Sequence, residues 1–116
     1  MTIEKSYIHL LETLKKEITS ARIKAHFAVN TELITLYWKI GKHILERQKE
    51  EGWGSKAVER ISQDLRNEFP EMTGLSLRNL IYMQTFAKAY SSFEFTQQLV
   101  AKLPWGHITY LLDKLS

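Results

Sequence analysis

Apolar residues recur at helical spacing from residue 7 to residue 44, and no glycine or proline interrupts the chain before Gly41. The steps alternate between four and three residues, so these side chains fall on one face of a helix. The first stripe comprises Tyr7, Leu11, Leu14, Ile18, Ala21, Ala25 and Ala28. After a shift of one position, the stripe continues at Val29, Leu33, Leu36, Ile40 and Ile44. Asn30 and Thr31 are suitable N-cap residues at the shift. The pattern predicts either two helices, at about 3–28 and 31–50, or one long helix with an offset seam.

Turn residues divide the rest of the chain into shorter helices. Gly52-Trp53-Gly54 marks a turn, after which Ser55 is placed to cap a helix at about 55–69. Pro70 ends that helix, and Ser76 caps the next one, at about 76–90. Two further helices are predicted at about 94–101 and 105–115. The residues expected on the inner faces are Val58, Ile61, Leu65, Leu80, Met83, Phe86 or Ala87, Tyr90, Ile108, Leu111, Leu112 and Leu115.

No run of alternating polar and apolar residues predicts a strand, so the expected fold class is all-α. A chain of 116 residues can bury one modest core. We therefore expect a single compact multi-helix domain over residues 1–116, with long N-terminal helices and a helix-turn-helix-like pair. The pair would be the helices at 55–69 and 76–90. Their connection of about seven residues is longer than the usual three or four.

Several kinds of chemistry lack the residues that they require. The chain has no cysteine and its five glycines are scattered, which excludes thiolate zinc sites and glycine-rich phosphate loops. No histidine has a second ligand at the spacing of one helical turn, and the four are His9, His26, His43 and His107. Asp64, Glu68 and Asp113 lack the adjacent strands of a PD-(D/E)xK nuclease site. We expect no enzyme activity, no metal and no cofactor.

The apolar runs are too short to span a bilayer, and the N-terminal residues carry no apolar signal segment. These features predict a cytoplasmic protein without a membrane partner. The net charge is +3 and the pI is near 9.2. This basic excess is compatible with a nucleic-acid partner but is too small to argue for one.

Polar side chains gather in the helix predicted at 76–90, which has the position of the recognition helix in a helix-turn-helix. The candidate DNA-contacting residues are Ser76, Arg78, Asn79, Tyr82, Gln84 and Lys88. Arg78 suits guanine or phosphate, and Asn79 and Gln84 suit adenine. Tyr82 and Lys88 suit the DNA backbone. Alternatively, Arg78 and Asn79 form a solvated helix start or hydrogen-bond within the fold.

The three tryptophans allow two interpretations. An indole ring can stack on a nucleic-acid base. A tryptophan on an apolar stripe or in a glycine turn is more often part of the core, where its large ring packs. We predict core positions for Trp38, Trp53 and Trp105.

Several stretches of the sequence are distinctive when taken together. Residues 30–41 are NTELITLYWKIG, followed by GWG at 52–54, ISQDL at 61–65 and FP at 69–70. Residues 74–83 are GLSLRNLIYM, and residues 103–107 are LPWGH. In this order they resemble the N-terminal domain of the YhcG family, long classed as a domain of unknown function. Its corresponding signatures include N-E-L-I-x-L-Y-W-x-I-G, G-F-S-x-R-N-L-x-Y-M and L-P-W-S-H.

The departures from the family pattern are few. Leu75 stands where phenylalanine is usual, Gln84 where arginine is common, and Gly106 where serine is common. Loss of the arginine removes one expected phosphate contact. Full-length relatives resemble PD-(D/E)xK nucleases of bacteria and mobile elements, with this helical region in front of the catalytic domain. The resemblance implies a targeting or assembly domain whose nuclease half lies beyond residue 116, and it assigns no catalytic residue here.

Two functional hypotheses follow. The leading one is a DNA-binding module of helix-turn-helix type, which requires a basic, exposed face on the helix predicted at 76–90. The alternative is homodimerisation or protein interaction through the N-terminal helices, without autonomous DNA binding. It requires an apolar seam that one chain leaves uncovered, formed by Tyr7, Leu11, Leu14 and Ile18.

Overall fold

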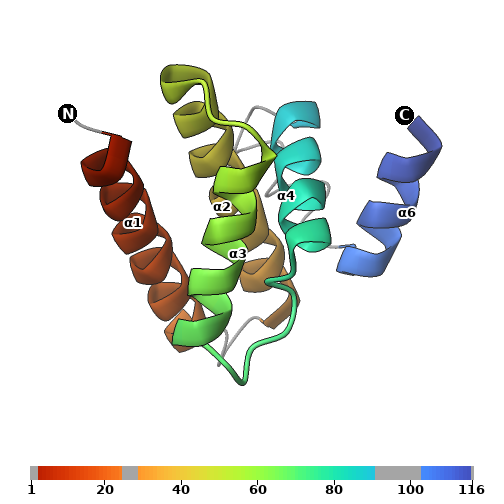
Figure 1. Cartoon of the computed structure of the whole chain (residues 1–116). Coiled ribbons are helices and arrows are strands. Elements are labelled where there is room, and N and C mark those ends of the chain that lie inside the picture. Colours follow the sequence, from red (N-terminus) through yellow and green to blue (C-terminus); the bar gives the residue numbers. More distant parts are fainter. Residues whose placement is uncertain (1–2, 25–28, 91–102, 116) are drawn as a thin grey trace.

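The computed structural model describes residues 3–24, 29–90 and 103–115, which are helical and contain no strand (Figure 1). The helices are α1 (Ile3–Lys24), α2 (Val29–Glu51), α3 (Ser55–Glu68), α4 (Leu77–Ala89) and α6 (Trp105–Leu115). The predicted all-α fold class is confirmed. The helix expected at 94–101, like residues 25–28 of the first predicted helix, lies outside the described residues.

The N-terminal half forms two helices rather than one. α1 and α2 pack side by side, which excludes a continuous helix over residues 3–50 (Figure 1). α2 also packs along α4, while α3 lies against both α1 and α4. α6 packs on α4 at the opposite edge of the molecule from α1 (Figure 1). The arrangement places α4 in contact with α2 and α3 and also with α6.

The main core lies between α1, α2, α3 and α4, because each helix contributes its apolar stripe to it. Its most deeply buried side chains are Leu10, Leu14, Ile18, Ile40, Ile44, Ile61, Leu65, Leu75, Leu80 and Met83. A second cluster joins α2 and α4 to α6 and comprises Ile34, Trp38, Phe86, Ala87, Ile108 and Leu112. The predicted inner faces of α3 and α4 are confirmed, except that Tyr90 is only half-buried. On α6 the prediction was wrong for Leu111, which is exposed.

The apolar seam required by the homodimer hypothesis is covered within the single chain. Tyr7, Leu14 and Ile18 are buried in the main core, and Leu11 packs against it. Leu10, which the predicted stripe omitted, is 1% exposed. Leu10 lies three residues after Tyr7 and four before Leu14, so it also has helical spacing, and Leu11 lies at the margin of the buried face.

The close crossing of α2 and α4 depends on Gly41, which is buried. A Cβ atom at this position would overlap the backbone carbonyl of Met83 and approach the backbone nitrogen of Gln84. Only glycine allows the two backbones to lie this close. The crossing therefore explains a glycine in the middle of a long helix, where its conformational entropy is unfavourable.

The helix ends follow the turn residues closely. The Ser76 hydroxyl accepts a hydrogen bond from the Asn79 N–H at 3.2 Å, which confirms Ser76 as the N-cap of α4. Ser55 was predicted to cap α3, but Gly54 is the N-cap and Ser55 is the first helical residue. α3 ends at Glu68, so the residue before Pro70 lies outside the helix as expected.

Candidate functional site

Asn79, predicted to read adenine, is instead bound within the fold. Its Nδ2 donates to the Gly74 carbonyl at 2.7 Å, and its Oδ1 accepts from Trp105 Nε1 at 2.7 Å. Both ends of the amide are therefore occupied. Gly74 has a φ of +92°, and its side-chain hydrogen faces the Tyr37 hydroxyl, so the loop before α4 requires glycine here. Asn79 fixes this loop and holds the first turn of α6 against α4.

The tryptophans pack as the core hypothesis requires. Trp38 is 3% exposed, and Trp53 and Trp105 are half-buried against the core. The Trp105 ring lies edge-on to Tyr37 and Phe86, with centroid separations of 4.8 and 5.5 Å. Trp38 Nε1 donates to the Tyr90 carbonyl. All three tryptophans therefore pack in or against the core, as predicted.

Gln84, the second predicted adenine reader, does not lie on the exposed face of α4. It is half-buried, and its Nε2 atom is buried without a hydrogen-bond partner among the described residues. Its backbone lies at the crossing with Gly41. An amide in this position cannot reach a base edge unless the side chain is rearranged.

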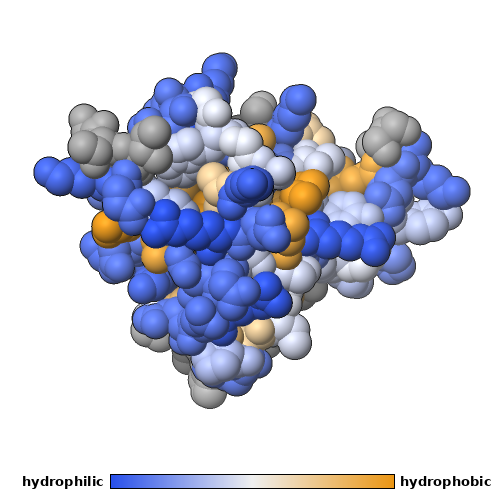
Figure 2. Space-filling view, viewed as in Figure 1, coloured by the Kyte–Doolittle hydropathy of each residue, from blue (hydrophilic) through white to orange (hydrophobic). Residues whose placement is uncertain are grey.

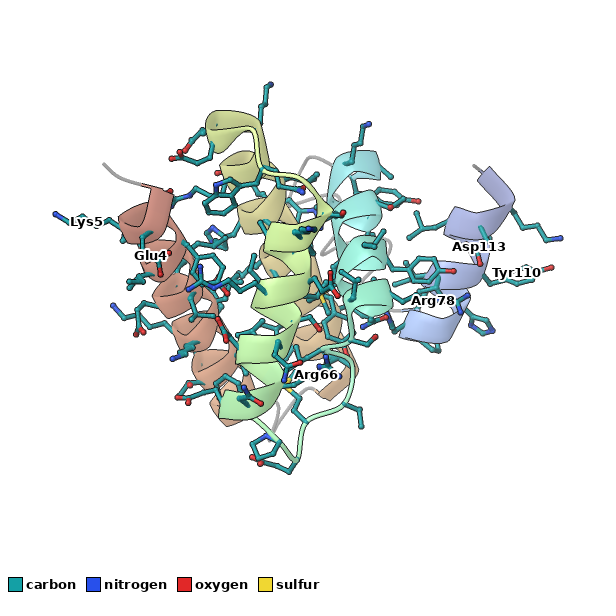
Figure 3. All side chains as sticks on the ribbon, in the orientation of Figure 1. Glu4, Lys5, Arg66, Arg78, Tyr110 and Asp113 are labelled. Atoms are coloured by element: carbon teal, nitrogen blue, oxygen red, sulfur yellow. The ribbon has the colours of Figure 1, made fainter. Side chains whose placement is uncertain are left out.

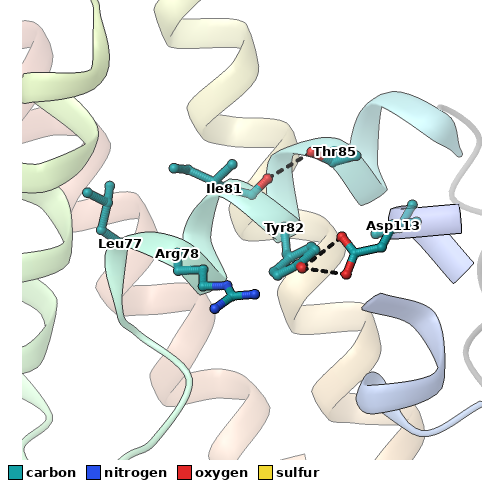
Figure 4. A pocket seen from close by; sticks show the side chains of 7 residues that line it. Leu77, Arg78, Ile81, Tyr82, Thr85 and Asp113 are labelled. Atoms are coloured by element: carbon teal, nitrogen blue, oxygen red, sulfur yellow. Dashed lines mark hydrogen bonds between the residues drawn. The ribbon is translucent and has the colours of Figure 1, made fainter. Parts of the chain in front are cut away.

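Tyr82 joins α4 to α6 rather than facing solvent alone. Its hydroxyl lies 2.8 Å from both carboxylate oxygens of Asp113, to which it donates (Figure 4). The Arg78 guanidinium lies over the same ring, 5.9 Å from its centroid. The pKa of Arg78 is raised, mainly by the Tyr82 hydroxyl and to a smaller extent by the negative charge of Asp113. Arg78 is exposed and remains a cation at every relevant pH.

Four exposed residues of α4 form a single stripe, which we call the outer α4 face: Arg78, Ile81, Thr85 and Lys88. Their steps of three, four and three residues place them on one side of the helix. The predicted set thus separates into two parts. Arg78 and Lys88 are exposed cations on this face. Asn79 and Tyr82 are hydrogen-bonded to other parts of the protein, the Gln84 amide nitrogen is buried, and Ser76 caps the helix.

Sequence reasoning missed Ile81 and Thr85. Ile81 is 48% exposed and is one of four large apolar or aromatic side chains at the surface of the described residues, with Ile8, Tyr110 and Leu111. The signal was present in the sequence, because both residues lie at helical spacing from Arg78. An isoleucine and a threonine have no side-chain group typical of base pairing in the major groove, whereas Asn79 and Gln84 do.

A shallow groove of about 450 Å³ runs between the outer α4 face and α6 (Figure 4). Its walls are Leu77, Arg78, Ile81, Tyr82, Thr85, Leu112 and Asp113. Hydrophobic surface is visible over α4 and towards α6, bordered by hydrophilic residues (Figure 2). Figure 3 shows Arg78 on α4 with Asp113 and Tyr110 on the facing helix α6. Tyr110 and Leu111 are 59% and 46% exposed.

Among the described residues, no group of three or more histidine, aspartate or glutamate side chains is arranged to hold a metal ion. Within the same ranges, every helix is too short or too polar to serve as a bilayer span.

The comparisons with known proteins give a family but no characterised relative. No curated protein and no solved structure matches the chain. The family model described as the DUF1016 N-terminal domain matches residues 13–116, which is most of the chain and includes all the stretches that resemble the YhcG-type domain. The chain therefore belongs to the DUF1016 N-terminal domain family.

Proposed function

We propose that this domain is a non-catalytic DNA-binding module that inserts the outer α4 face into the major groove of duplex DNA. The observation that carries the proposal is the stripe itself: exposed cations at both ends, Arg78 and Lys88, enclose the smaller or apolar side chains Ile81 and Thr85. α3 comes directly before α4 in the chain, as the first helix of a helix-turn-helix comes before its recognition helix.

The dimensions of the stripe suit the major groove. The helical rise separates Arg78 and Lys88 by about 15 Å along the axis. The groove is about 12 Å wide and has a phosphate backbone on each side. Long side chains at the two ends of the stripe can therefore reach opposite backbones while the centre of the stripe faces the base edges. Arg66, exposed at the end of α3, adds a third cation on the helix before α4.

The position of α6 limits how the duplex can approach. α6 packs on α4, and its exposed face carries Tyr110 and Lys114, with the Lys114 ammonium 5.4 Å from the Tyr110 ring centroid. Both side chains suit phosphate contacts. Asp113 faces the same groove and repels phosphate, so the duplex would pass on the Arg78 side of that carboxylate.

From the YhcG-type resemblance we further propose that the module targets an associated PD-(D/E)xK nuclease domain. The alternative is that the domain assembles proteins, either as a homodimer or through the apolar groove between α4 and α6. The groove's exposed Ile81 side chain favours this second candidate, whereas the burial of the α1 seam removes support for a dimer through α1.

Fluorescence anisotropy of labelled duplex DNA over a salt series tests the DNA-binding proposal. We expect binding that weakens with salt, and the Arg78→Ala/Lys88→Ala variant should show a log–log salt slope smaller by about 2, because two phosphate contacts are lost. The matched control is Lys5→Ala/Lys16→Ala, which removes two exposed cations from α1, on the far side of the molecule (Figure 3).

Circular dichroism must first show that both double variants keep the helical content of the parent chain. Equal loss of binding in both would mean that only the net charge matters. No binding at tens of micromolar would contradict the proposal. A stable dimer in sedimentation, together with absent DNA binding, would favour the assembly function.

A further inference from the structure

The centre of the outer α4 face offers a base edge no ready hydrogen-bond donor. Ile81 is apolar, and the Thr85 hydroxyl donates its hydrogen to the Ile81 carbonyl at 3.1 Å (Figure 4). The Thr85 methyl group adds to the apolar surface of Ile81, while the hydroxyl oxygen keeps only its capacity to accept a hydrogen bond. Both side chains line the groove beside α4. The part of the helix that would meet the bases is therefore mainly aliphatic.

The two amides that were predicted to read adenine do not face the DNA side of α4. Asn79 holds the Gly74 carbonyl and the Trp105 indole, and the Nε2 atom of Gln84 is buried. Arg78 remains as a polar reader, but only at the first turn of the helix. Sequence recognition at the centre of the stripe must then depend on apolar contact rather than on amide pairing with a base.

The major groove presents one strongly apolar feature to such a surface, the methyl group at C5 of a pyrimidine. Thymine carries it, and aliphatic side chains such as threonine contact it in the major groove. Cytosine carries it only when methylated. An aliphatic helix face between two cations matches a row of methyl groups between two phosphate backbones.

We propose that Ile81 and Thr85 recognise the C5-methyl group of pyrimidines, with thymine in A·T pairs as the principal target. This inference rests on the proposed DNA-binding function and specifies what the module reads. Duplex DNA is the occupant that the charges favour, because Arg78 and Lys88 enclose the aliphatic pair as phosphate backbones enclose the bases. Loss of a single methyl contact should weaken binding by about threefold to fivefold.

The test compares alternating dA-dT duplexes with dA-dU duplexes of equal length, which differ only in the C5-methyl group. A second pair, dG-dC and dG-5-methyl-dC, separates thymine from 5-methylcytosine as the source of the methyl group. Each duplex is titrated with the parent chain and with the Ile81→Ala/Thr85→Ser variant. Both substitutions are at exposed positions, and serine preserves the hydroxyl that bonds to the helix backbone.

The parent chain should prefer dA-dT over dA-dU, and the variant should bind both alike. A methyl preference confined to A·T pairs assigns the contact to thymine, and one in G·C pairs as well assigns it to 5-methylpyrimidines. The inference would be overturned if the parent chain bound dA-dT and dA-dU equally. The proposed function would remain intact if, in that case, DNA binding still weakened with salt and was still reduced in Arg78→Ala/Lys88→Ala.

Two other results would also overturn the inference. If the variant kept the parent's preference for dA-dT, the preference would come from duplex shape rather than from these side chains. Binding of the parent chain to any of the duplexes is measured first. If the parent chain bound none of them, the proposed function itself would fail.

Discussion

Trp105 Nε1 donates a hydrogen bond to Asn79 Oδ1 at 2.7 Å and thereby connects two helices that are separated by residues 90–104. The other end of the same amide, Asn79 Nδ2, donates a hydrogen bond to the Gly74 carbonyl. Gly74, Ser76, Asn79 and Trp105 all belong to the stretches that resemble the YhcG-type signatures, and here they form one hydrogen-bonded cluster. The cluster explains these signature positions by structure, without a DNA contact.

This cluster predicts that Asn79→Ala destabilises the fold. The substitution leaves the Gly74 carbonyl and the Trp105 N–H without their partner, at a cost of about 2–3 kcal/mol. Urea denaturation followed by circular dichroism measures the change. The neighbouring exposed variant Arg78→Ala should stay within about 0.5 kcal/mol of the parent chain. Equal stability of Asn79→Ala and the parent would show that the amide contributes no net free energy.

Alanine substitution should have opposite effects at Gly41, which lies at the α2–α4 crossing, and at Gly106 in α6. Gly41→Ala forces a Cβ atom into the Met83 carbonyl and should lower the free energy of unfolding by about 2–3 kcal/mol. Gly106→Ala meets no atom within 4 Å and lies in the first turn of α6, so it should raise the free energy by up to about 1 kcal/mol. Thermal or urea unfolding of the two variants checks the pair. An unchanged free energy of unfolding in Gly41→Ala would contradict the prediction and show that α2 and α4 can move apart with little loss of stability.

The ion pair between α1 and α3 gives a pH prediction. Arg60 donates to both Glu4 carboxylate oxygens, at 2.8 and 3.1 Å, and this hydrogen bonding lowers the pKa of Glu4 from its usual 4.5. Because the folded-state pKa lies below the unfolded one, the stabilisation is present above pH 4.5 and is lost as pH falls through the folded pKa. The effect is small, since both side chains are exposed.

Glu4→Gln should therefore flatten the decline in stability below pH 4.5, while leaving the rest of the pH profile parallel to that of the parent. Melting temperatures measured across this acidic range provide the comparison. Glu59→Gln, an exposed position on α3, is the matched control and should keep the parent's slope. Identical slopes for Glu4→Gln and the parent would show that the pair does not stabilise the fold.

The helices could be predicted from the sequence because their limits are set by local backbone chemistry. The glycine turn at 52–54, Pro70 and Ser76 act on their immediate neighbours, and the helix ends beside them lie within one residue of the predicted ones. Burial was less certain where two neighbours compete for one core. Leu10 and Leu11 both have helical spacing from Tyr7 and Leu14, and only the packing of α1 on its neighbouring helices makes Leu10 the more deeply buried.

The candidate site was harder to predict because its residues depend on distant partners. An asparagine after an arginine at a helix start gives the same sequence pattern whether its side chain contacts DNA or the loop before its own helix. Its role depends on Trp105, whose position follows from the packing of α6 on α4. The same packing engages Tyr82 with Asp113. Arg78 and Lys88 are exposed, as the DNA-binding hypothesis required, because their positions on α4 face away from the core.

Asp113 gives the sharpest prediction about the proposed interface. Its carboxylate lies in the groove beside the outer α4 face and close enough to Arg78 to affect the pKa of that side chain. Asp113→Asn removes the negative charge but keeps an oxygen that can accept the Tyr82 hydroxyl, so the α4–α6 contact should survive. With less repulsion of phosphate, duplex affinity should rise about twofold to fivefold at low salt and by less at high salt.

Glu12→Gln on α1 makes the same charge change far from α6 and should leave the affinity nearly unaltered. Because a duplex that avoids α4 would not sense this carboxylate, an unchanged affinity in Asp113→Asn would place the DNA on another surface.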